Sequence, residues 1–438
     1  MVPRTLVLSH TEQRERLTTS CPEAVEATLV AGDPTHDRIL AGLPWRERYR
    51  EHLDTGDRAL VLVSSTWGPT SLLGTRPALL HRLLEELPVD EYRIVLALHP
   101  NVWHGHGPWQ VRSWLAEAER AGLRLLPPRQ GWQAALTAAD HVIGDHGSVT
   151  FYGAALGTHT MLGAFPHHEM DPTSPVAAFG RTATHLDIDE PLLPQILTDA
   201  AEHTPNRFSA CTDQLNSEPG RAAEILRAHF YRLLDLPEPP QRARVRPPEP
   251  PVPHRRVWPD SAETTPLLAT AVSNGPEVHV SRYPERMVRN GTLTLHRPHL
   301  VVRDDEPDPR DRERADVVVC GGGDPGWNRL GVALEENRQS ALACAADRDT
   351  CLILTRDGRR YRLTPEKPLL APEVLASAFW RIRVNHDFAP PTMVFTARVG
   401  ERTTRVYVDP HPPPKPSSPL DPVDLANTHV TEPHHPAP

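Results

Sequence analysis

Short apolar runs alternate with amphipathic stretches over the first half of the chain. Five apolar runs have the length of strands: 59–63, 93–98, 123–126, 141–143 and 160–165. Three stretches between them have helical periodicity: 77–87, 109–121 and 131–139. This order predicts βαβ units, and therefore an α/β fold in which helices cover both faces of a parallel sheet. Such sheets bind ligands at the carboxyl ends of their strands, so polar residues just after each run are the first candidates for chemistry.

The pattern changes after a proline-rich segment, 237–264, which we interpret as a linker between domains. Nine of the 23 residues from 237 to 259 are proline, and proline holds the chain extended. Strand-like runs then flank three turn-forming pairs, which are Asn290-Gly291, Asp357-Gly358 and Gly400-Glu401. These pairs predict hairpins in a smaller β-rich α+β module over 265–410. The Pro-rich segment 411–438 has no periodicity and is predicted to be disordered.

Composition narrows the class of protein. The chain carries 47 basic and 56 acidic residues, a net charge of −9, which argues against a partner that is nucleic acid. Its five cysteines include no Cys-x-x-Cys pair, and no apolar run approaches the ~18 residues of a membrane span. We therefore expect a soluble, cytoplasmic protein. Histidines are frequent, but His104 and His106 lack a carboxylate at metal-ligand spacing, so the sequence predicts no metal and no cofactor.

The strongest local signal lies in the turn after the run 141–143, where a helix is predicted to begin near Thr150. Free N–H groups and the helix dipole make such a turn suited to an anion. Its small and polar residues are the candidates for holding a phosphate: Asp145, His146, Gly147, Ser148 and Thr150. A hydroxyl residue there equally suits an ordinary helix N-cap with no ligand, so both interpretations stay open.

Two further strand ends carry candidates. His99 closes the run 93–98 and precedes Pro100, so its imidazole can donate to a phosphate or act as an acid or base. The loop after 59–63 could wrap a diphosphate or an acceptor with its polar and aromatic residues, which are Ser64, Ser65, Thr66 and Trp67. A hydrogen-bonded filler histidine and ordinary loop-capping residues are the bland alternatives.

Four short motifs carry a resemblance. They are Gly-Asp-Pro-Thr-His-Asp (32–37), Val-Ser-Ser-Thr-Trp (63–67), Leu-Ala-Leu-His-Pro (96–100) and Gly-Asp-His-Gly-Ser-Val (144–149). In order and spacing they resemble the CDP-glycerol glycerophosphotransferase family, which builds teichoic acid polymers of bacterial cell walls on a GT-B scaffold. The resemblance implies that residues 51–236 form the Rossmann-like C-terminal half of a GT-B fold. It also implies that His99 and Ser148 face the donor diphosphate, with Arg129 and Trp132 near the base.

The chain departs from the family pattern at several positions. His146-Gly147 replaces Tyr-Ser, Thr35 replaces an arginine, and Gly68 stands where a basic residue is common. The family's His-Gly-Thr motif, which supplies its proposed base, has no counterpart, and residues 1–50 suffice only for a remnant of the N-terminal half. A start placed too late, a separate chain that supplies the missing half, and a degenerate binder are the three open explanations.

The sequence therefore predicts a transferase-like protein that binds a nucleotide-diphosphate donor, either CDP-glycerol or a nucleotide sugar. It would transfer a glycerophosphate or glycosyl group to a hydroxyl acceptor, with His99 as the catalytic residue. The acceptor could lie at a membrane surface, which would make the protein peripheral to the membrane. The alternative is a non-catalytic nucleotide-binding or scaffold protein derived from a GT-B enzyme.

Overall fold

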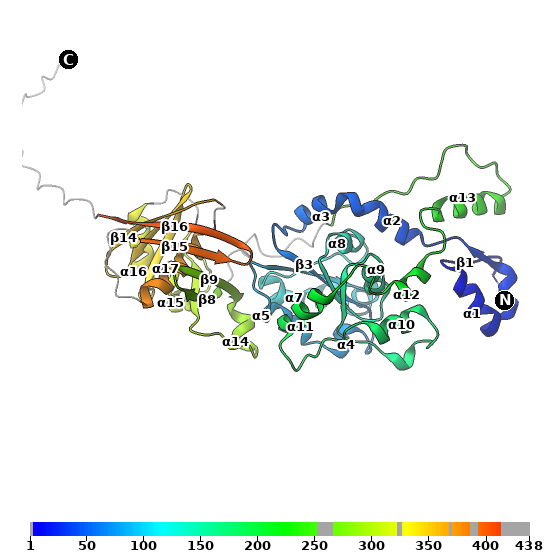
Figure 1. Ribbon diagram of the computed structural model, residues 1–438, viewed down its shortest axis with the longest axis horizontal. Helices are drawn as coiled ribbons and strands as arrows, with labels where there is room; N and C mark the ends of the chain where they lie inside the picture. Colours follow the sequence, from blue (N-terminus) through cyan, green and yellow to red (C-terminus); the bar gives the residue numbers. More distant parts are fainter. Residues whose placement is uncertain (1–2, 252–265, 322–325, 368–369, 386–392, 413–438) are drawn as a thin grey trace, which may run out of the picture.

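The computed structural model describes residues 3–251, 266–321, 326–367, 370–385 and 393–412. Its two main sheets are a five-stranded parallel sheet in the first half of the chain and a nine-stranded closed barrel in the second. Figure 1 shows the barrel at one end of an elongated molecule, the parallel sheet with its helices in the middle, and the first strand and helix at the other end. A mixed α/β architecture with a separate β-rich unit is therefore present, as predicted.

The parallel sheet has the strand order β5-β4-β3-β6-β7. Its strands confirm all five predicted runs: β3 (Ala59–Ser65), β4 (Tyr92–Leu98), β5 (Arg124–Leu125), β6 (His141–Gly144) and β7 (His159–Leu162). Alternate side chains of a strand point to opposite faces. Accordingly, Val61 and Val63 pack in one core cluster, while Leu60 and Leu62 pack in another. Both faces of the sheet are buried, which explains why apolar residues dominate the strand segments of the sequence.

Helices cover both faces of this sheet. The predicted helical stretches are confirmed as α5 (Leu79–Glu86), α7 (Pro108–Arg120) and α8 (Trp132–Ala138). The remaining helices around the sheet are α2 (Pro34–Gly42), α3 (Arg46–His52), α4 (Leu72–Thr75), α6 (Pro100–His106), α9 (Ser148–Ala155), α10 (Pro175–Thr182), α11 (Leu192–Glu202) and α12 (Ser209–Thr212). A further helix, α13 (Ala222–Leu233), lies near the N-terminal strand, and its His229 is 2.9 Å from Thr5 (Figure 1). Side chains of α4, α5 and α7 join one core cluster, and those of α2, α3 and α8 join the other.

The order of the strands reverses at β3, because β4 lies on one side of it and β6 on the other. At such a switch point the loops that follow the two central strands diverge and open a crevice at the carboxyl edge of the sheet. The register pairs Ser65 with Leu98 and Val63 with Ile143. The loops after β3, β4 and β6 therefore begin at the same edge.

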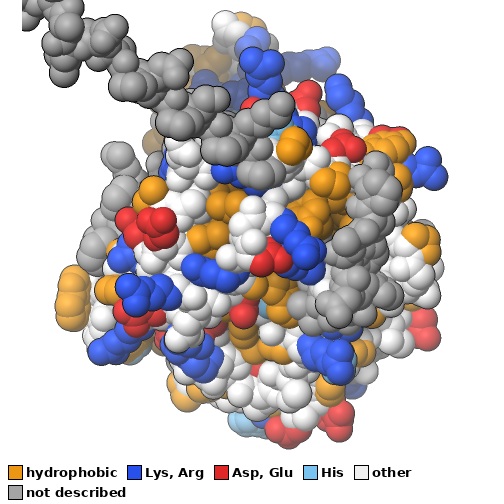
Figure 2. Space-filling model, turned by 90° about the vertical axis from the view of Figure 1, so that its left-hand side faces the viewer, with side chains coloured by type: hydrophobic (Ala, Val, Ile, Leu, Met, Phe, Trp, Pro, Cys, Tyr) orange, Lys and Arg blue, Asp and Glu red, His pale blue; other side chains and the backbone are white. Residues whose placement is uncertain are grey.

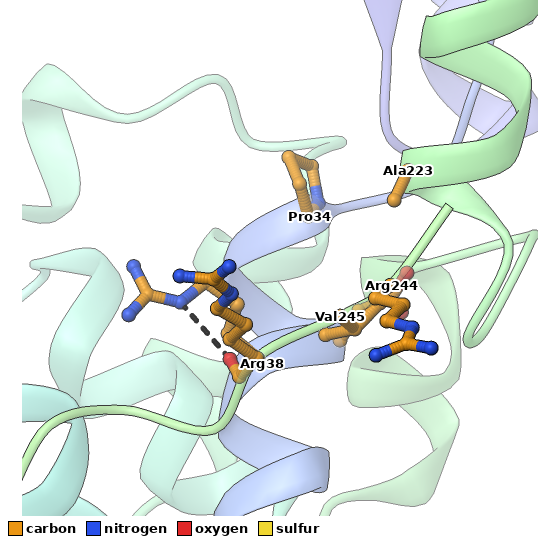
Figure 3. A pocket seen from close by; sticks show the side chains of 7 residues that line it. Pro34, Arg38, Ala223, Arg244 and Val245 are labelled. Atoms are coloured by element: carbon orange, nitrogen blue, oxygen red, sulfur yellow. Dashed lines mark hydrogen bonds between the residues drawn. The ribbon is translucent and has the colours of Figure 1, made fainter. Parts of the chain in front are cut away.

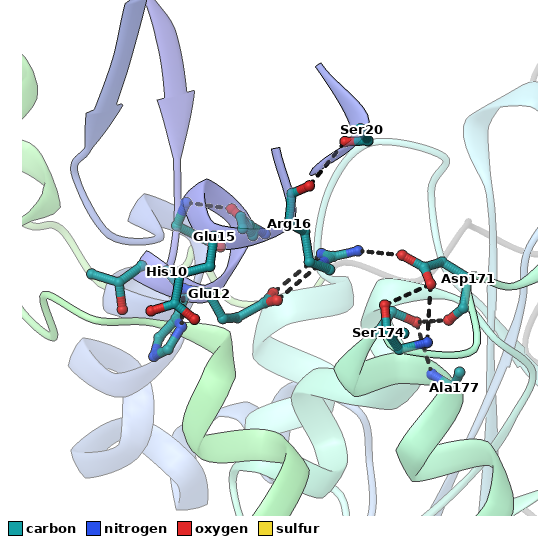
Figure 4. Close-up of polar contacts among 12 residues, drawn as sticks. His10, Glu12, Glu15, Arg16, Ser20, Asp171, Ser174 and Ala177 are labelled. Atoms are coloured by element: carbon teal, nitrogen blue, oxygen red, sulfur yellow. Dashed lines mark hydrogen bonds and ion pairs between the residues drawn. The ribbon is translucent and has the colours of Figure 1, made fainter. Parts of the chain in front are cut away.

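The N-terminal unit consists of a parallel pair of strands, β1 (Leu6–Leu8) and β2 (Thr28–Val30), joined through α1 (Thr11–Ser20). Arg16 of α1 lies between two carboxylates, at 2.8 Å from Glu12 and 3.0 Å from Asp171 (Figure 4). The second contact attaches α1 to the segment that precedes α10. That residues 1–50 are the remnant of a second GT-B half stays a prediction.

The proline-rich segment is described as far as residue 251 and contains neither helix nor strand over 237–251. This part packs against the helices of the parallel sheet, because the buried Tyr49 hydroxyl donates to the carbonyl of Pro248 at 2.7 Å. The rest of the predicted linker, 252–264, lies outside the described residues. So does nearly all of the tail, from residue 413 onward.

The barrel runs in the order β10-β11-β12-β13-β14-β16-β15-β9-β8. Its strands are β8 (Leu267–Asn274), β9 (Glu277–Pro284), β10 (His299–Arg303), β11 (Val317–Cys320), β12 (Leu342–Asp347), β13 (Thr350–Thr355), β14 (Arg360–Pro365), β15 (Met393–Val399) and β16 (Arg402–His411). The apolar face of α17 (Pro372–Asn385) shares one core cluster with the strands, and α16 (Trp327–Glu336) shares another. A further helix, α15 (Pro309–Arg314), precedes β11.

Two of the three predicted hairpins are confirmed and one is wrong. Asp357-Gly358 turns between β13 and β14, and Gly400-Glu401 turns between β15 and β16. Asn290-Gly291 instead ends a helix, α14 (Glu285–Asn290), for which Gly291 is the C-cap. The reason is tertiary packing, since the buried Met287 of α14 joins the core cluster that contains α5.

A buried ion pair joins the barrel to the parallel-sheet half. Arg282 of β9 donates to both carboxylate oxygens of Asp90, at 2.8 and 2.6 Å, and each side chain is only 8% exposed. Glu373 of α17 lies 3.2 Å from the same guanidinium. Burial alone would raise the pKa of Asp90, but the charge and hydrogen bonds of Arg282 hold it below its ordinary value.

Over the described residues, no helix has both the length and the apolar character needed to cross a membrane. Figure 2 looks at the barrel end of the molecule. Basic and acidic side chains lie interspersed there, with apolar side chains between them. This mixture differs from the basic stripe that nucleic-acid-binding surfaces carry.

Candidate functional site

A buried carboxylate connects two of the loops at the carboxyl edge of the sheet. Asp145, directly after β6, is fully buried. Its Oδ2 accepts from the backbone N–H and the hydroxyl of Thr66 and from the backbone N–H of Leu72, each at 2.8 Å. Its Oδ1 accepts from the N–H of Gly147 at 3.0 Å. Asp145 therefore fixes the loop after β3 against the loop after β6.

Gly147 permits this close approach. A Cβ atom at this position would lie 2.4 Å from the methyl carbon of Thr66, so a larger residue would push the two loops apart. Its backbone is extended, with φ −72° and ψ 155°, a conformation that any residue can adopt. The requirement for glycine is thus steric contact with Thr66.

The first turn of α9 presents unpaired backbone donors. Gly147 is the N-cap and contributes no side-chain hydrogen bond, whereas Thr150 and Phe151 donate to its carbonyl. The expectation that a hydroxyl residue caps a helix beginning near Thr150 is wrong: the helix begins at Ser148, two residues earlier. Ser148 is exposed, and neither its N–H nor that of Val149 has an acceptor among the described residues. Such N–H groups and the helix dipole favour an anion.

His99 stands at the end of β4, beside these loops. Its backbone N–H donates to the carbonyl of Ser65 at 3.0 Å. Its Nδ1 accepts from the N–H of Asn101 at 3.1 Å and so caps α6, of which Pro100 is the first residue. Partial burial lowers the pKa of His99 and the charge of Asp145 opposes this, so the net effect favours the neutral ring. A neutral ring that accepts at Nδ1 carries its proton at Nε2, ready to donate to a ligand.

The remaining predicted residues fall into two groups. Ser64, Ser65 and Thr150 are buried, and the Ser65 hydroxyl accepts from the N–H of Leu73. The others lie in the segments that follow β3, β5 and β6, and each makes a different contact. Trp67 is 56% exposed, and the centroid of its ring lies 6.3 Å from that of His99. The Arg129 guanidinium lies 3.3 Å from Nε2 of His104. Trp132 stacks on Tyr152 with ring centroids 6.1 Å apart, and His146 lies edge-on to Phe165 with centroids 6.5 Å apart.

One contact near the site was not anticipated from the sequence. Tyr152 of α9 donates its hydroxyl to Asp33 Oδ2 at 2.6 Å, while Oδ1 of the same carboxylate caps α2. Burial, reinforced by this hydrogen bond, raises the pKa of Tyr152 well above its usual range. The signal that could have indicated it is spacing, because Tyr152 lies four residues after Ser148 and hence one turn further along α9.

Among the residues that the structure describes, no group of three or more His, Cys, Asp or Glu side chains could hold a metal ion. Near the start of α9 this edge offers the backbone N–H groups of Ser148 and Val149, the exposed Ser148 side chain and the His99 imidazole. This set suits the binding of an anion by hydrogen bonds.

No protein-family model and no curated protein matches the chain. Similar solved structures include the wall teichoic acid polymerase TagF, with a TM-score of 0.38, 14% identity, and coverage of 53% of this chain and 57% of TagF. A glycosyltransferase from Rickettsia africae has a TM-score of 0.32 and 11% identity, covering 53% of this chain and 64% of that one. Anabaena HepE, solved with UDP and glucose, has a TM-score of 0.31 and 14% identity, covering 53% of this chain and 63% of HepE. The chain thus spans little more than half of TagF, and the function has to be argued from the site itself.

Proposed function

We propose that this protein binds a nucleotide-diphosphate donor at the carboxyl edge of the parallel sheet and transfers a glycerophosphate or glycosyl group from it to a hydroxyl acceptor. The observation that carries the proposal is the Asp145 bridge. It holds the loops after β3 and β6 together beside His99, so that the first-turn N–H groups of α9 and His99 Nε2 serve one edge. CDP-glycerol is the donor that the sequence motifs favour, since they resemble the CDP-glycerol glycerophosphotransferase family.

The chemistry of this proposal is stabilisation of a leaving group. The acceptor hydroxyl loses its proton to solvent water, its oxygen forms a bond to phosphorus or to an anomeric carbon, and the bond between that atom and the leaving phosphate oxygen breaks. The nucleotide departs with an additional negative charge. Hydrogen bonds from Ser148 N–H, Val149 N–H and His99 Nε2 would stabilise that charge. Asp145 is unsuited to take the acceptor proton, because both its oxygens already accept hydrogen bonds in a buried position.

A protein that binds the nucleotide without catalysing transfer is the second candidate. It is favoured because both oxygens of Asp145 already accept hydrogen bonds, so this carboxylate is unsuited to act as a base. Incubation of the chain with CDP-glycerol or UDP-glucose and a hydroxyl acceptor separates the two. Nucleotide release that depends on the acceptor supports transfer, whereas binding without release supports the non-catalytic function.

His99→Ala is expected to weaken binding of CDP, UDP or GDP, whichever binds the wild type, about tenfold. The reason is the loss of one hydrogen bond to a charged phosphate, which contributes about 1.5 kcal/mol. Isothermal titration calorimetry measures the effect, with His168→Ala as the matched control because its side chain is 80% exposed. Equal affinity of the wild type and His99→Ala would remove His99 from the site.

Ser148→Pro tests the backbone donor directly. Proline is well accepted at the first position of a helix, and the extended backbone of Gly147 is compatible with a following proline. We expect stability close to that of the wild type together with nucleotide binding weakened at least about tenfold, because the N–H is gone. Ser148→Ala, which keeps the N–H, is expected to lose about 1–2 kcal/mol of binding free energy through its hydroxyl. Unchanged affinity in Ser148→Pro would show that α9 does not bind the phosphate.

A further inference from the structure

A separate cavity of about 330 Å³ lies between α2, the start of α13 and the proline-rich segment (Figure 3). None of its lining residues belongs to the loops after β3, β4 and β6. Its lining is part apolar and part charged: Pro34, Asp37, Arg38, Ala223, Arg244, Val245 and Arg246. The volume is within the range of small-molecule sites, in which an apolar wall is combined with a few polar groups.

The charged side chains of this cavity are mostly cationic. Arg38, Arg244 and Arg246 contribute three guanidinium groups, all on exposed residues, and none forms a salt bridge with a carboxylate of the described residues. The Nε of Arg38 donates to the backbone carbonyl of Arg246 at 3.4 Å, which joins α2 to the segment (Figure 3). Their remaining N–H groups have no acceptor among the described residues.

The one acidic residue of the lining is already engaged. Asp37 is 3% exposed, and its carboxylate accepts from the backbone N–H groups of Gly220 and Ala222 at 2.7 and 3.1 Å. It therefore anchors the start of α13 to α2, and no carboxylate of the described residues pairs with the three guanidinium groups of the cavity.

We propose that this cavity is a second anion site, which binds a ligand carrying more than one phosphate group. Three guanidinium groups around one cavity favour a multiply charged anion over a single carboxylate, because each planar fork can donate two parallel hydrogen bonds to a phosphate. The apolar side chains of Pro34, Ala223 and Val245 would contact the carbon part of such a ligand. The proposal is independent of the donor site at the sheet edge.

Pyrophosphate is the probe for the test. It is titrated at low ionic strength into the full chain carrying both His99→Ala and Ser148→Pro, so that binding at the proposed donor site is strongly weakened. In this background, Arg244→Glu together with Arg246→Glu is expected to weaken pyrophosphate binding at least about tenfold. Arg242→Glu is the matched control, since it lies in the same segment but outside the cavity lining, and its affinity should change less than about twofold.

The outcomes distinguish this proposal from the donor site. If the background chain does not bind pyrophosphate, or if Arg242→Glu weakens binding as much as the cavity variants do, the cavity proposal is overturned. If acetate binds as tightly as pyrophosphate, the preference for phosphate is wrong. Nucleotide affinity at the donor site, measured with His99 and Ser148 intact, is expected to be retained in the Arg244 and Arg246 variants, so a loss there would show that the two sites are not independent.

Discussion

Asp145→Asn is expected to lower the free energy of unfolding by about 3 kcal/mol and to abolish nucleotide binding. The substitution keeps the shape of the side chain but replaces one acceptor oxygen with a donor NH2. Either Gly147 N–H or the donors of Thr66 and Leu72 would then face another donor in a buried place. Each buried donor left without an acceptor costs about 1–3 kcal/mol. Urea unfolding and calorimetry with CDP, UDP and GDP measure the two effects.

The matched control for this prediction is Asp189→Asn, because Asp189 is exposed and lies outside the loops that follow β3 and β6. It should change stability by less than about 0.5 kcal/mol. An Asp145→Asn chain with wild-type stability would show that the bridge does not hold the loops together. A destabilised chain that still binds nucleotide with full affinity would separate the bridge from the site.

Arg282→Met is expected to destabilise the protein by about 3–5 kcal/mol at pH 7, because it leaves Asp90 buried without its partner. The methionine keeps an apolar stem of similar length, so the effect comes mainly from the unpaired carboxylate. The double variant Asp90→Leu with Arg282→Met removes both charges and should recover most of the loss. Arg310→Met, at an exposed arginine of the same half, is the control.

The pH dependence has a definite sign. The pKa of Asp90 in the folded protein is below its ordinary value of 3.8, so the pair contributes stability above pH 3.8 and loses it as the pH falls through the lowered pKa. In Arg282→Met, burial raises the pKa of Asp90 instead, and stability falls as the pH rises through that raised value. The difference between the two proteins should therefore shrink from pH 7 towards pH 3 in urea unfolding. A constant difference would contradict the assignment to Asp90.

The parallel sheet could be predicted from the sequence because its strands are buried on both faces. Residues 59–63 and 94–98 are continuous apolar runs, and the predicted helical stretches between the strands keep one apolar side. The position of His99 could be predicted as well, since it directly follows such a run and precedes a proline, which places it at the carboxyl end of the strand. In these segments the local pattern and the tertiary structure agree.

The rest depends on contacts between distant segments. The sequence indicated Asp145 as a ligand-binding residue, but its buried position and its bonds to Thr66 and Leu72 follow only from the packing of two loops. Asn290-Gly291 has the composition of a hairpin turn, yet Met287 packs against α5 and ERMVRN becomes α14. The arginine cavity could not be anticipated, because Arg38 and Arg244 lie about 200 residues apart in the sequence.

A crystal structure of the chain with CDP tests the central claim most directly. We predict that the two phosphates occupy the carboxyl edge of the sheet, within hydrogen-bond distance of His99 Nε2 and of the N–H groups of Ser148 and Val149. Phosphates found only in the cavity of Arg38, Arg244 and Arg246, or anywhere else away from the loops that Asp145 joins, would contradict it.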